Sequence, residues 1–536
     1  MAESSSYKWL VLGNVMLTTF MAVLDATVVN TGLPVIMGTL GTSMNSAEWI
    51  LTGYMLSMAT ILSAAGWLAN RFGYKVIFLL SLSLFTFGSF MCGNSSSIGE
   101  LILWRIIEGI GSGLLIPVGM AIITSVFPPK QRGLALGFWA ISSAASVSFG
   151  PMIGGYLVDN FNWNYIFFVN VPIGIICFIF TMIVQKEIRL QSHLKFDFGG
   201  FMTSAIFLPA VLFGLSQVNS STNAQGWNSP VVMGCMWLAA ISFVLFIVIE
   251  LSVKTPLIDL RIFKNRNFTF ANIIVFIFGI GMFGSTFLMP LYMQDALGYT
   301  AFQAGLIFMP VGLLQAIASP IAGKLTRYID ARIIIGLGIL MLSYSFYLNI
   351  FLTYQTDHAY ILRSLIFRGV AFGMLYPPLL ALSLRDIGPL QMAQASSITN
   401  IIRQVGGSFG VSLFTFMLVI RQNYHAQRFS ESINYTGEMY RETINKLREF
   451  FLSTGAPSIE NASEKASKLI TKRIGIEAYI NAINDDFFIG IIFVLISLLP
   501  IFFLNGKKQY TRLGEPHPSK FSISPKELSE QENKNL

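Results

Sequence analysis

The chain has 536 residues, of which 54% are hydrophobic and 12% are charged, with a net charge of +8. An ordinary soluble domain carries about 25% charged residues, so this composition excludes the usual soluble globular protein. The positive charge does not indicate nucleic-acid binding, because the basic residues gather in alternate short loops. Apolar runs of about 20 residues recur along the whole length, as in membrane-spanning helices. The sequence therefore predicts an all-α protein of the lipid bilayer.

Fourteen apolar segments are predicted to span the membrane. In chain order they are 9–30, 47–69, 76–95, 101–127, 133–158, 165–185, 198–216, 230–251, 268–294, 301–323, 333–353, 360–384, 393–420 and 485–505. The even-numbered short loops between them contain fifteen Lys or Arg, and the odd-numbered short loops contain none. Because positive residues stay on the cytoplasmic side, we expect both termini in the cytoplasm.

An internal repeat divides the chain. A shift of 260 residues without gaps superimposes glycines, prolines and a loop glutamine, and a shift of 257 places "GWLANRFGYK" (66–75) on "GKLTRYIDAR" (323–332). The matched pairs include Gly109 and Gly369, Gly113 and Gly373, Pro117 and Pro377, Pro129 and Pro389, and Gln131 and Gln391. Chance does not explain so many agreements in one register.

The repeat predicts two homologous six-helix halves, a pattern typical of secondary transporters. We assign residues 1–190 to the first half and 268–505 to the second, which includes a long outer loop at 421–484. Two inserted helices with their loops occupy 191–267, and 506–536 form a polar cytoplasmic tail.

Three charged residues lie deep in apolar spans of the first half. Asp25 is about 24 Å along the first span, and Arg105 and Glu108 lie about 8 to 12 Å below the outer surface, so all three can share one level. A charge at this depth is costly and needs a partner or a watery cavity. Asp25 and Arg105 could form a permanent structural ion pair, but we favour an Asp25 carboxyl that exchanges protons. For Glu108, a local i,i+3 pair with Arg105 explains its position about as well as a direct proton role.

The second half offers no equivalent group by this alignment. The 260-residue shift places Ser285 opposite Asp25 and Leu365 opposite Arg105. The later spans contain three weaker candidates for functional residues, Arg363, Arg368 and Arg403. Of these we expect Arg403 to line a cavity. We therefore expect proton chemistry to be concentrated in the first half.

Several motifs resemble those of the major facilitator superfamily. The loop "GWLANRFGYK" contains its signature residues Gly66, Arg71, Gly73 and Lys75. The span-four sequence "RIIEGIGSGLLIPVGMAII" (105–123) and the span-five sequence beginning "SFGPMIGG" (148–155), with Gly150, Pro151, Gly154 and Gly155, are similar to the family's motifs. "LDATVVNTGLP" (24–34) resembles span one of fourteen-span drug:proton antiporters, and "LIDLRIFKNRNF" (257–268) and "YHAQRFSES" (424–432) resemble the EmrB type of multidrug exporter. Two positions depart from the family's motifs. The family usually has Asp where this chain has Asn70, and Gln where this chain has Glu108.

The resemblance implies the major facilitator fold and a proton-driven multidrug antiporter of the bacterial inner membrane. It implies no enzyme activity, cofactor or metal. Amphipathic drug-like compounds would enter an apolar cavity between the halves, for which Tyr54, Asn30 and Arg403 are candidate lining residues. A proton-coupled importer or a single-substrate exporter of the same fold is the alternative.

The outer loop at 421–484 contains two amphipathic stretches. One stretch places Tyr440, Ile444, Leu447 and Phe451 on one helical face, and the other does so for Ala466, Leu469, Ile470 and Ile474. The loop could be a lid over its own transporter. The resemblance favours a docking surface for an EmrA-like periplasmic membrane-fusion adaptor, with an outer-membrane channel beyond it.

Overall fold

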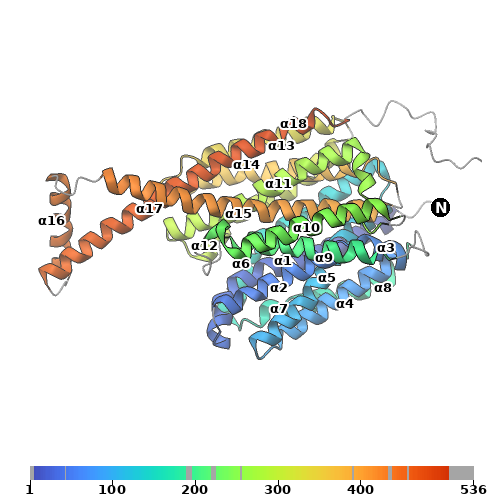
Figure 1. The fold of residues 1–536 in the computed structure, drawn as a ribbon, viewed down its shortest axis with the longest axis horizontal. Coiled ribbons are helices and arrows are strands. Elements are labelled where there is room, and N and C mark those ends of the chain that lie inside the picture. Colours follow the sequence, from blue (N-terminus) through green and yellow to red (C-terminus); the bar gives the residue numbers. More distant parts are fainter. Residues whose placement is uncertain are drawn as a thin grey trace, which may run out of the picture.

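The structure is a computed structural model. It describes residues 5–42, 44–188, 196–218, 225–253, 256–326, 328–388, 391–432, 438–454 and 458–505, and the predicted tail at 506–536 lies outside them. Within these ranges every regular element is a helix (Figure 1). The predicted all-α fold is confirmed.

The N-terminal half is a bundle around α5. Its helices are α1 (Ser5–Leu40), α2 (Met44–Leu62), α3 (Ala65–Phe72), α4 (Tyr74–Gly93), α5 (Ile98–Val126), α6 (Pro129–Asn160), α7 (Tyr165–Phe168) and α8 (Asn170–Val184). α5 packs against α1, α2 and α4, and α1 also packs against α6 and α8. α2 and α3 form one span that is bent by 53° at the break between them.

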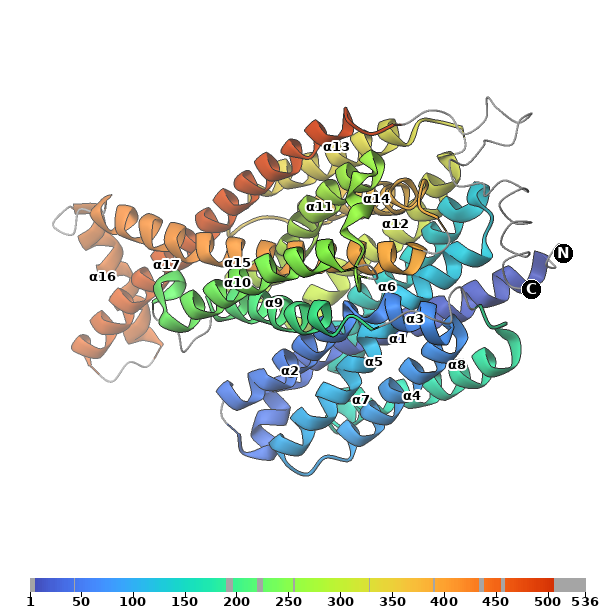
Figure 2. The same cartoon turned by 45° about the vertical axis from the view of Figure 1, so that its right-hand side comes forward.

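Two inserted helices form a hairpin on the outside of the bundle. α9 (Phe198–Gln217) and α10 (Pro230–Ser252) pack against each other, and the short helix η1 (Gly226–Asn228) lies in the connection between them. α9 also contacts α2 of the first half and α15 of the second (Figure 2). The hairpin therefore covers a seam between the halves.

The C-terminal half contains the longest helices. It comprises η2 (Leu260–Lys264), α11 (Arg266–Leu291), η3 (Tyr292–Ala296), α12 (Ala301–Leu325), α13 (Ala331–Asn349), α14 (His358–Ser383), α15 (Met392–Ser432), α16 (Glu438–Ser453), α17 (Ile459–Ile496) and α18 (Leu498–Ile501). α15 has 41 residues and α17 has 38, which makes them roughly 60 Å long at 1.5 Å per residue. The hydrocarbon core is about 30 Å thick, so both helices extend well beyond it and carry α16 away from the bundle (Figure 1).

The number of spans differs from the expectation. In the described part of the chain, twelve helices are long and apolar enough to cross a membrane, and the bent pair of α2 and α3 makes thirteen. The segment predicted at 133–158 forms α6, a helix of 32 residues that is not among those thirteen. The multi-pass class is confirmed, but the count of fourteen is not.

Candidate functional site

Asp25, Arg105 and Glu108 meet in one buried cluster, which we call the charge cluster. Nη1 of Arg105 donates to Oδ2 of Asp25 at 2.7 Å and to Oε2 of Glu108 at 2.8 Å. None of the three side chains is exposed. One guanidinium nitrogen from α5 is thus shared between carboxylates of α1 and α5.

Neighbouring helices hold the charge cluster in place. Nδ2 of Asn170, at the start of α8, donates to Oδ1 of Asp25 at 3.1 Å. The ring of Tyr54 on α2 lies 4.1 Å from the Arg105 guanidinium carbon, close enough for a cation–π contact. The Tyr54 hydroxyl donates to Ser112 on α5 at 2.8 Å. Asn170 is missing from the sequence prediction because a neutral amide in an apolar segment gives no charge signal.

The charges of the cluster do not balance when both carboxyls are ionised. Two carboxylates then face one guanidinium, and one bound proton makes the cluster neutral. Oε1 of Glu108 and Nη2 of Arg105 have no hydrogen-bond partner in the described part of the chain. Since an uncompensated charge is costly at a buried position, the cluster has the charge and the free acceptor to hold one proton.

The two halves meet closely at the end of the bundle that the loop charges assign to the cytoplasm. A Cβ atom added to Gly66 of α3 would lie 2.9 Å from Cα of Gln394 on α15, and one added to Gly133 of α6 would lie 2.9 Å from the carbonyl oxygen of Gly323 on α12. The internal repeat relates these contacts, because the 257-residue shift takes Gly66 to Gly323. Only glycine permits such an approach at these positions, and this end of the bundle is tightly packed.

The rest of the loop motif shapes the start of α4. Gly73 has a φ of 103°, a conformation that favours glycine, and the Glu187 carboxylate occupies the space where a side chain would lie. Glu187 accepts hydrogen bonds from the backbone nitrogens of Lys75 and Val76 at 3.2 and 3.3 Å. A carboxylate at this helix N-terminus is favourable. Arg71 lies in the last turn of α3, and Lys75 donates to the carbonyl of Met182.

The span-five motif lies within α6, against α1. Gly150 is buried and packs directly on the Thr27 side chain. Gly154 is also buried, whereas a Cβ on Gly155 would meet open space. The side chain of Pro151 lies outside the described residues. Close contact with α1 is therefore observed for one glycine of the motif and not for Gly155.

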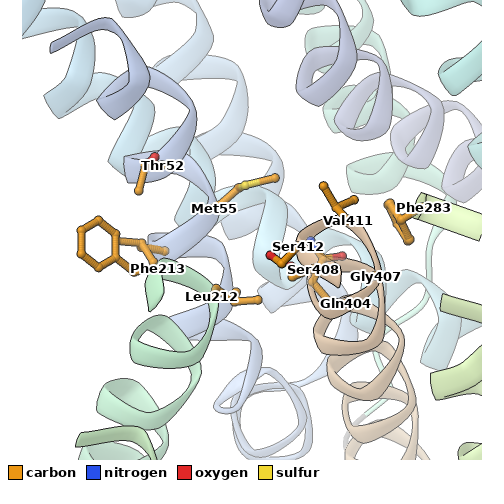
Figure 3. Close-up of a pocket in the computed structure, with 11 residues that line it drawn as sticks. Thr52, Met55, Leu212, Phe213, Phe283, Gln404, Gly407, Ser408, Val411 and Ser412 are labelled. Carbon is orange, nitrogen blue, oxygen red and sulfur yellow. The ribbon is translucent and has the colours of Figure 1, made fainter. Parts of the chain in front are cut away.

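A cavity of about 170 Å³ lies on the seam between the halves (Figure 3). It is lined by Thr52, Met55 and Leu56 of α2, by Leu212 and Phe213 of α9, by Phe283 of α11, and by Gln404, Gly407, Ser408, Val411 and Ser412 of α15. None of these eleven side chains is charged, and most of the surface they present is apolar. An engineered cavity of about 150 Å³ accommodates benzene, so this one has room for a single aromatic ring.

The residues predicted to line a drug cavity are dispersed. Tyr54 is 3% exposed and packs on Arg105 of the charge cluster. The side chain of Asn30 lies outside the described residues. Arg403 is half-buried, next to the cavity-lining Gln404, and its guanidinium carbon lies 5.5 Å from the Tyr376 ring and 5.9 Å from the Phe283 ring. The sequence did not predict that an inserted helix, α9, would form a wall of the cavity.

Comparison with known proteins identifies the fold family. The family model described as Major Facilitator Superfamily matches residues 15–411. The chain belongs to the major facilitator superfamily. Within this superfamily it is similar to the multidrug export protein EmrB of Escherichia coli K12, with 31% identity over 489 residues, 90% of this chain and 93% of EmrB. It is 30% identical to the fatty acid resistance protein FarB of Neisseria gonorrhoeae over 506 residues, 94% of this chain and 96% of FarB.

Solved structures of the superfamily agree with this fold. The human organic anion transporter MFSD10 (TETRAN) superimposes with a TM-score of 0.56 at 13% identity, covering 91% of this chain and 99% of that one. The proton:xylose symporter XylE superimposes with a TM-score of 0.53 at 16% identity, covering 80% and 92%. The predicted EmrB-type resemblance is confirmed, and the protein is a major facilitator transporter rather than an enzyme.

Proposed function

We propose that this major facilitator protein is a proton-driven multidrug exporter that works by alternating access. The observation that carries the proposal is the charge cluster, in which Asp25 and Glu108 share Nη1 of Arg105 without exposure to solvent. An intramembrane cluster that becomes neutral on taking up one proton is suited to carrying that proton across. The names of relatives such as EmrB support drug export as the coupled process.

In the proposed cycle, Asp25 binds a proton from the outer side while the closely packed cytoplasmic end is shut. The contacts of Gly66 with Gln394 and of Gly133 with Gly323 hold that end closed. When they open, Asp25 releases its proton to the cytoplasm as drug binds. Outward return of the loaded protein then exports the drug.

The seam cavity supplies the proposed site for part of the drug. Its apolar walls suit a ring or short alkyl group, and Thr52, Gln404 and Ser408 offer polar groups for a single polar substituent. The rest of an amphipathic molecule would extend towards Arg403 and the aromatic ring of Tyr376. The name of the relative FarB is consistent with amphipathic substrates.

The partner proposal rests on the helices that extend beyond the bundle. α16 and the first part of α17 pack on each other, so the predicted apolar faces partly cover one another. Phe450, Ile459 and Leu469 remain 57%, 64% and 44% exposed. α16 lies away from the bundle (Figure 1), which favours a periplasmic adaptor dock over a lid. We place the protein in the bacterial inner membrane, with both termini cytoplasmic and an outer-membrane channel beyond the adaptor.

Transport into inverted membrane vesicles tests the proposed function. With an acidic interior, the vesicles should accumulate drug, and collapse of the proton gradient should abolish the accumulation. A proton-coupled importer, which is the alternative, would instead move its substrate out of such vesicles together with protons. Drug accumulation that ignores the proton gradient would contradict the proposal.

A further inference from the structure

A cation without an acidic partner lies in the membrane-spanning part of α15. Arg403 is eleven residues after Met392, the first residue of this helix, which places it about 16 Å along the helix, or about half of the hydrocarbon thickness. Among the described residues no carboxylate forms an ion pair with it, and its Nε has no hydrogen-bond partner. Nη2 donates to Oδ1 of Asn400 on the same helix at 3.4 Å, a long distance for a hydrogen bond. A charge at this depth needs a partner or a watery cavity.

Two other arginines of the spans differ from Arg403. Arg105 is shared by two carboxylates, and Arg368 donates to the carbonyl of Ser285 at 3.2 Å. Both are 0% exposed, whereas Arg403 is half-buried. Arg403 therefore combines a free donor with an accessible surface, which the other two do not.

Aromatic rings flank the Arg403 guanidinium. Its carbon lies 5.5 Å from the ring of Tyr376 on α14 and 5.9 Å from the ring of Phe283 on α11. Tyr376 is 5% exposed, and its hydroxyl has no hydrogen-bond partner in the described part of the chain. The Phe278 ring stacks on Tyr376 at 5.6 Å and fixes its orientation. A second unused donor, held by packing, thus accompanies the cation.

The apolar seam cavity adjoins this cation. Phe283 lines the cavity and also flanks Arg403, and the cavity-lining Gln404 is the next residue of α15 (Figure 3). None of the eleven residues around the cavity is charged. The carboxylates of the charge cluster are bound to Arg105 and leave the charge of Arg403 unbalanced. An uncharged pocket for a ring therefore lies next to a cation that lacks an anion.

We propose that Arg403 binds the head group of amphipathic organic anions, which carry a carboxylate or sulfonate on an aromatic or alkyl body. The proposal rests on the exporter function proposed above and names its substrate class. The body of the compound lies in the seam cavity, and two oxygens of the head group accept hydrogen bonds from the guanidinium, which matches this geometry. The Tyr376 hydroxyl supplies a further donor. A cationic compound meets a like charge at this position and is disfavoured.

Two probes of the same shape test the head-group preference. The probes are 4-phenylbutane-1-sulfonate, which stays ionised at every pH used, and the neutral 4-phenylbutane-1-sulfonamide. Equilibrium dialysis measures their binding to the full-length protein in lipid nanodiscs, with empty nanodiscs as the blank. The wild-type protein should bind the sulfonate at least about tenfold more tightly than the sulfonamide, because hydrogen bonds to a charged group are the stronger ones.

Substitutions of Arg403 test whether this side chain causes the preference. Arg403→Gln should bind both probes about equally and keep the wild-type affinity for the sulfonamide, which shows that the pocket is intact. Arg403→Lys keeps the charge and should keep a preference for the sulfonate. Arg428→Gln is the matched control, because Arg428 lies on the same helix, exposed and bonded to Tyr424, and it should behave as wild type.

Three results would overturn the role of Arg403. They are equal binding of the two probes by wild type, a sulfonate preference that persists in Arg403→Gln, and parallel loss of both probes in Arg403→Gln and Arg403→Lys. In inverted vesicles with an acidic interior, initial uptake of the sulfonate should fall at least about tenfold in Arg403→Gln. Sulfonate uptake by wild type that ignores the proton gradient would overturn the proton-driven function instead, and the binding preference would still decide whether Arg403 holds the anion.

Discussion

Replacement of Asp25 by Asn should uncouple transport while leaving the protein folded. Asparagine keeps the shape of the side chain and can still accept a hydrogen bond from Arg105, which stays paired with Glu108 at 2.8 Å. The change replaces an ion pair between guanidinium and carboxylate by a hydrogen bond from the same guanidinium to a neutral amide oxygen, which moves the interaction towards the lower end of the about 1.5–3 kcal/mol of hydrogen bonds to charged groups. The expected cost of about 1–2 kcal/mol is well below the roughly 3–5 kcal/mol for leaving a buried charge without a partner.

The effect on transport should be much larger. A proton moved through 100 mV and one pH unit supplies about 2.3 plus about 1.4 kcal/mol, or about 3.7 kcal/mol. This corresponds to a drug gradient on the order of 500-fold. Loss of the proton at Asp25 should lower gradient-driven accumulation by at least this factor.

Drug accumulation in proteoliposomes at an imposed gradient measures the loss, and thermal unfolding of the purified variant checks the fold. Asp295→Asn is the matched control, because Asp295 is exposed at a helix end and bonded to Tyr479. Wild-type accumulation by a correctly folded Asp25→Asn protein would refute the role of Asp25.

Four further changes test other parts of the site. Glu108→Gln should retain transport with a pH optimum moved to lower pH, because it removes a negative charge beside Asp25; complete loss in a folded variant would make Glu108 indispensable. Gly323→Ala should overpack the seam against Gly133 at a cost of about 1–3 kcal/mol and thereby favour opening of the cytoplasmic end about 5–150-fold. Faster labelling of cysteines introduced at that end would show the opening. Gly336→Ala is the control, because a Cβ has space there, and it should not change the labelling. Leu212→Trp should fill the seam cavity and raise the drug concentration for half-maximal transport at least about tenfold, a loss of about 1.4 kcal/mol, unlike Ile206→Trp on the exposed face of α9. Deletion of residues 438–475 should abolish resistance in cells but spare drug-induced proton release in liposomes; loss of both would indicate a lid, and loss of neither would remove the adaptor proposal.

Membrane class and helix positions were predictable because the bilayer restricts the chain. Without water in the hydrocarbon region, backbone groups must be satisfied within each segment, so long apolar runs become helices wherever they occur. The motif at 66–75 could be recognised because its turn restricts the residue type. Gly73 adopts a backbone conformation that favours glycine. The number of spans differs because α6, predicted as a span at 133–158, is more polar than α5 and α8. The single span predicted at 47–69 corresponds to the bent pair of α2 and α3.

Asp25, Arg105 and Glu108 stood out in the sequence because ionisable residues are rare inside apolar runs. Their partners did not. Tyr54 and Asn170 are neutral residues on other helices, and only packing brings an aromatic ring to 4.1 Å from Arg105 and an amide to 3.1 Å from Asp25. Likewise, α9 becomes a wall of the seam cavity only because the inserted hairpin folds across α2 and α15.

Asp485 and Asp486 illustrate this division most clearly. In the sequence they are two adjacent aspartates at the start of the apolar run predicted at 485–505. Successive residues of an α-helix point about 100° apart, so one carboxylate reaches Arg421 at the surface while the other faces the packed interior beside Phe487. The sequence determined that two acids lie next to each other in α17, and the packing of α11, α13 and α15 around that helix decided which of them is buried.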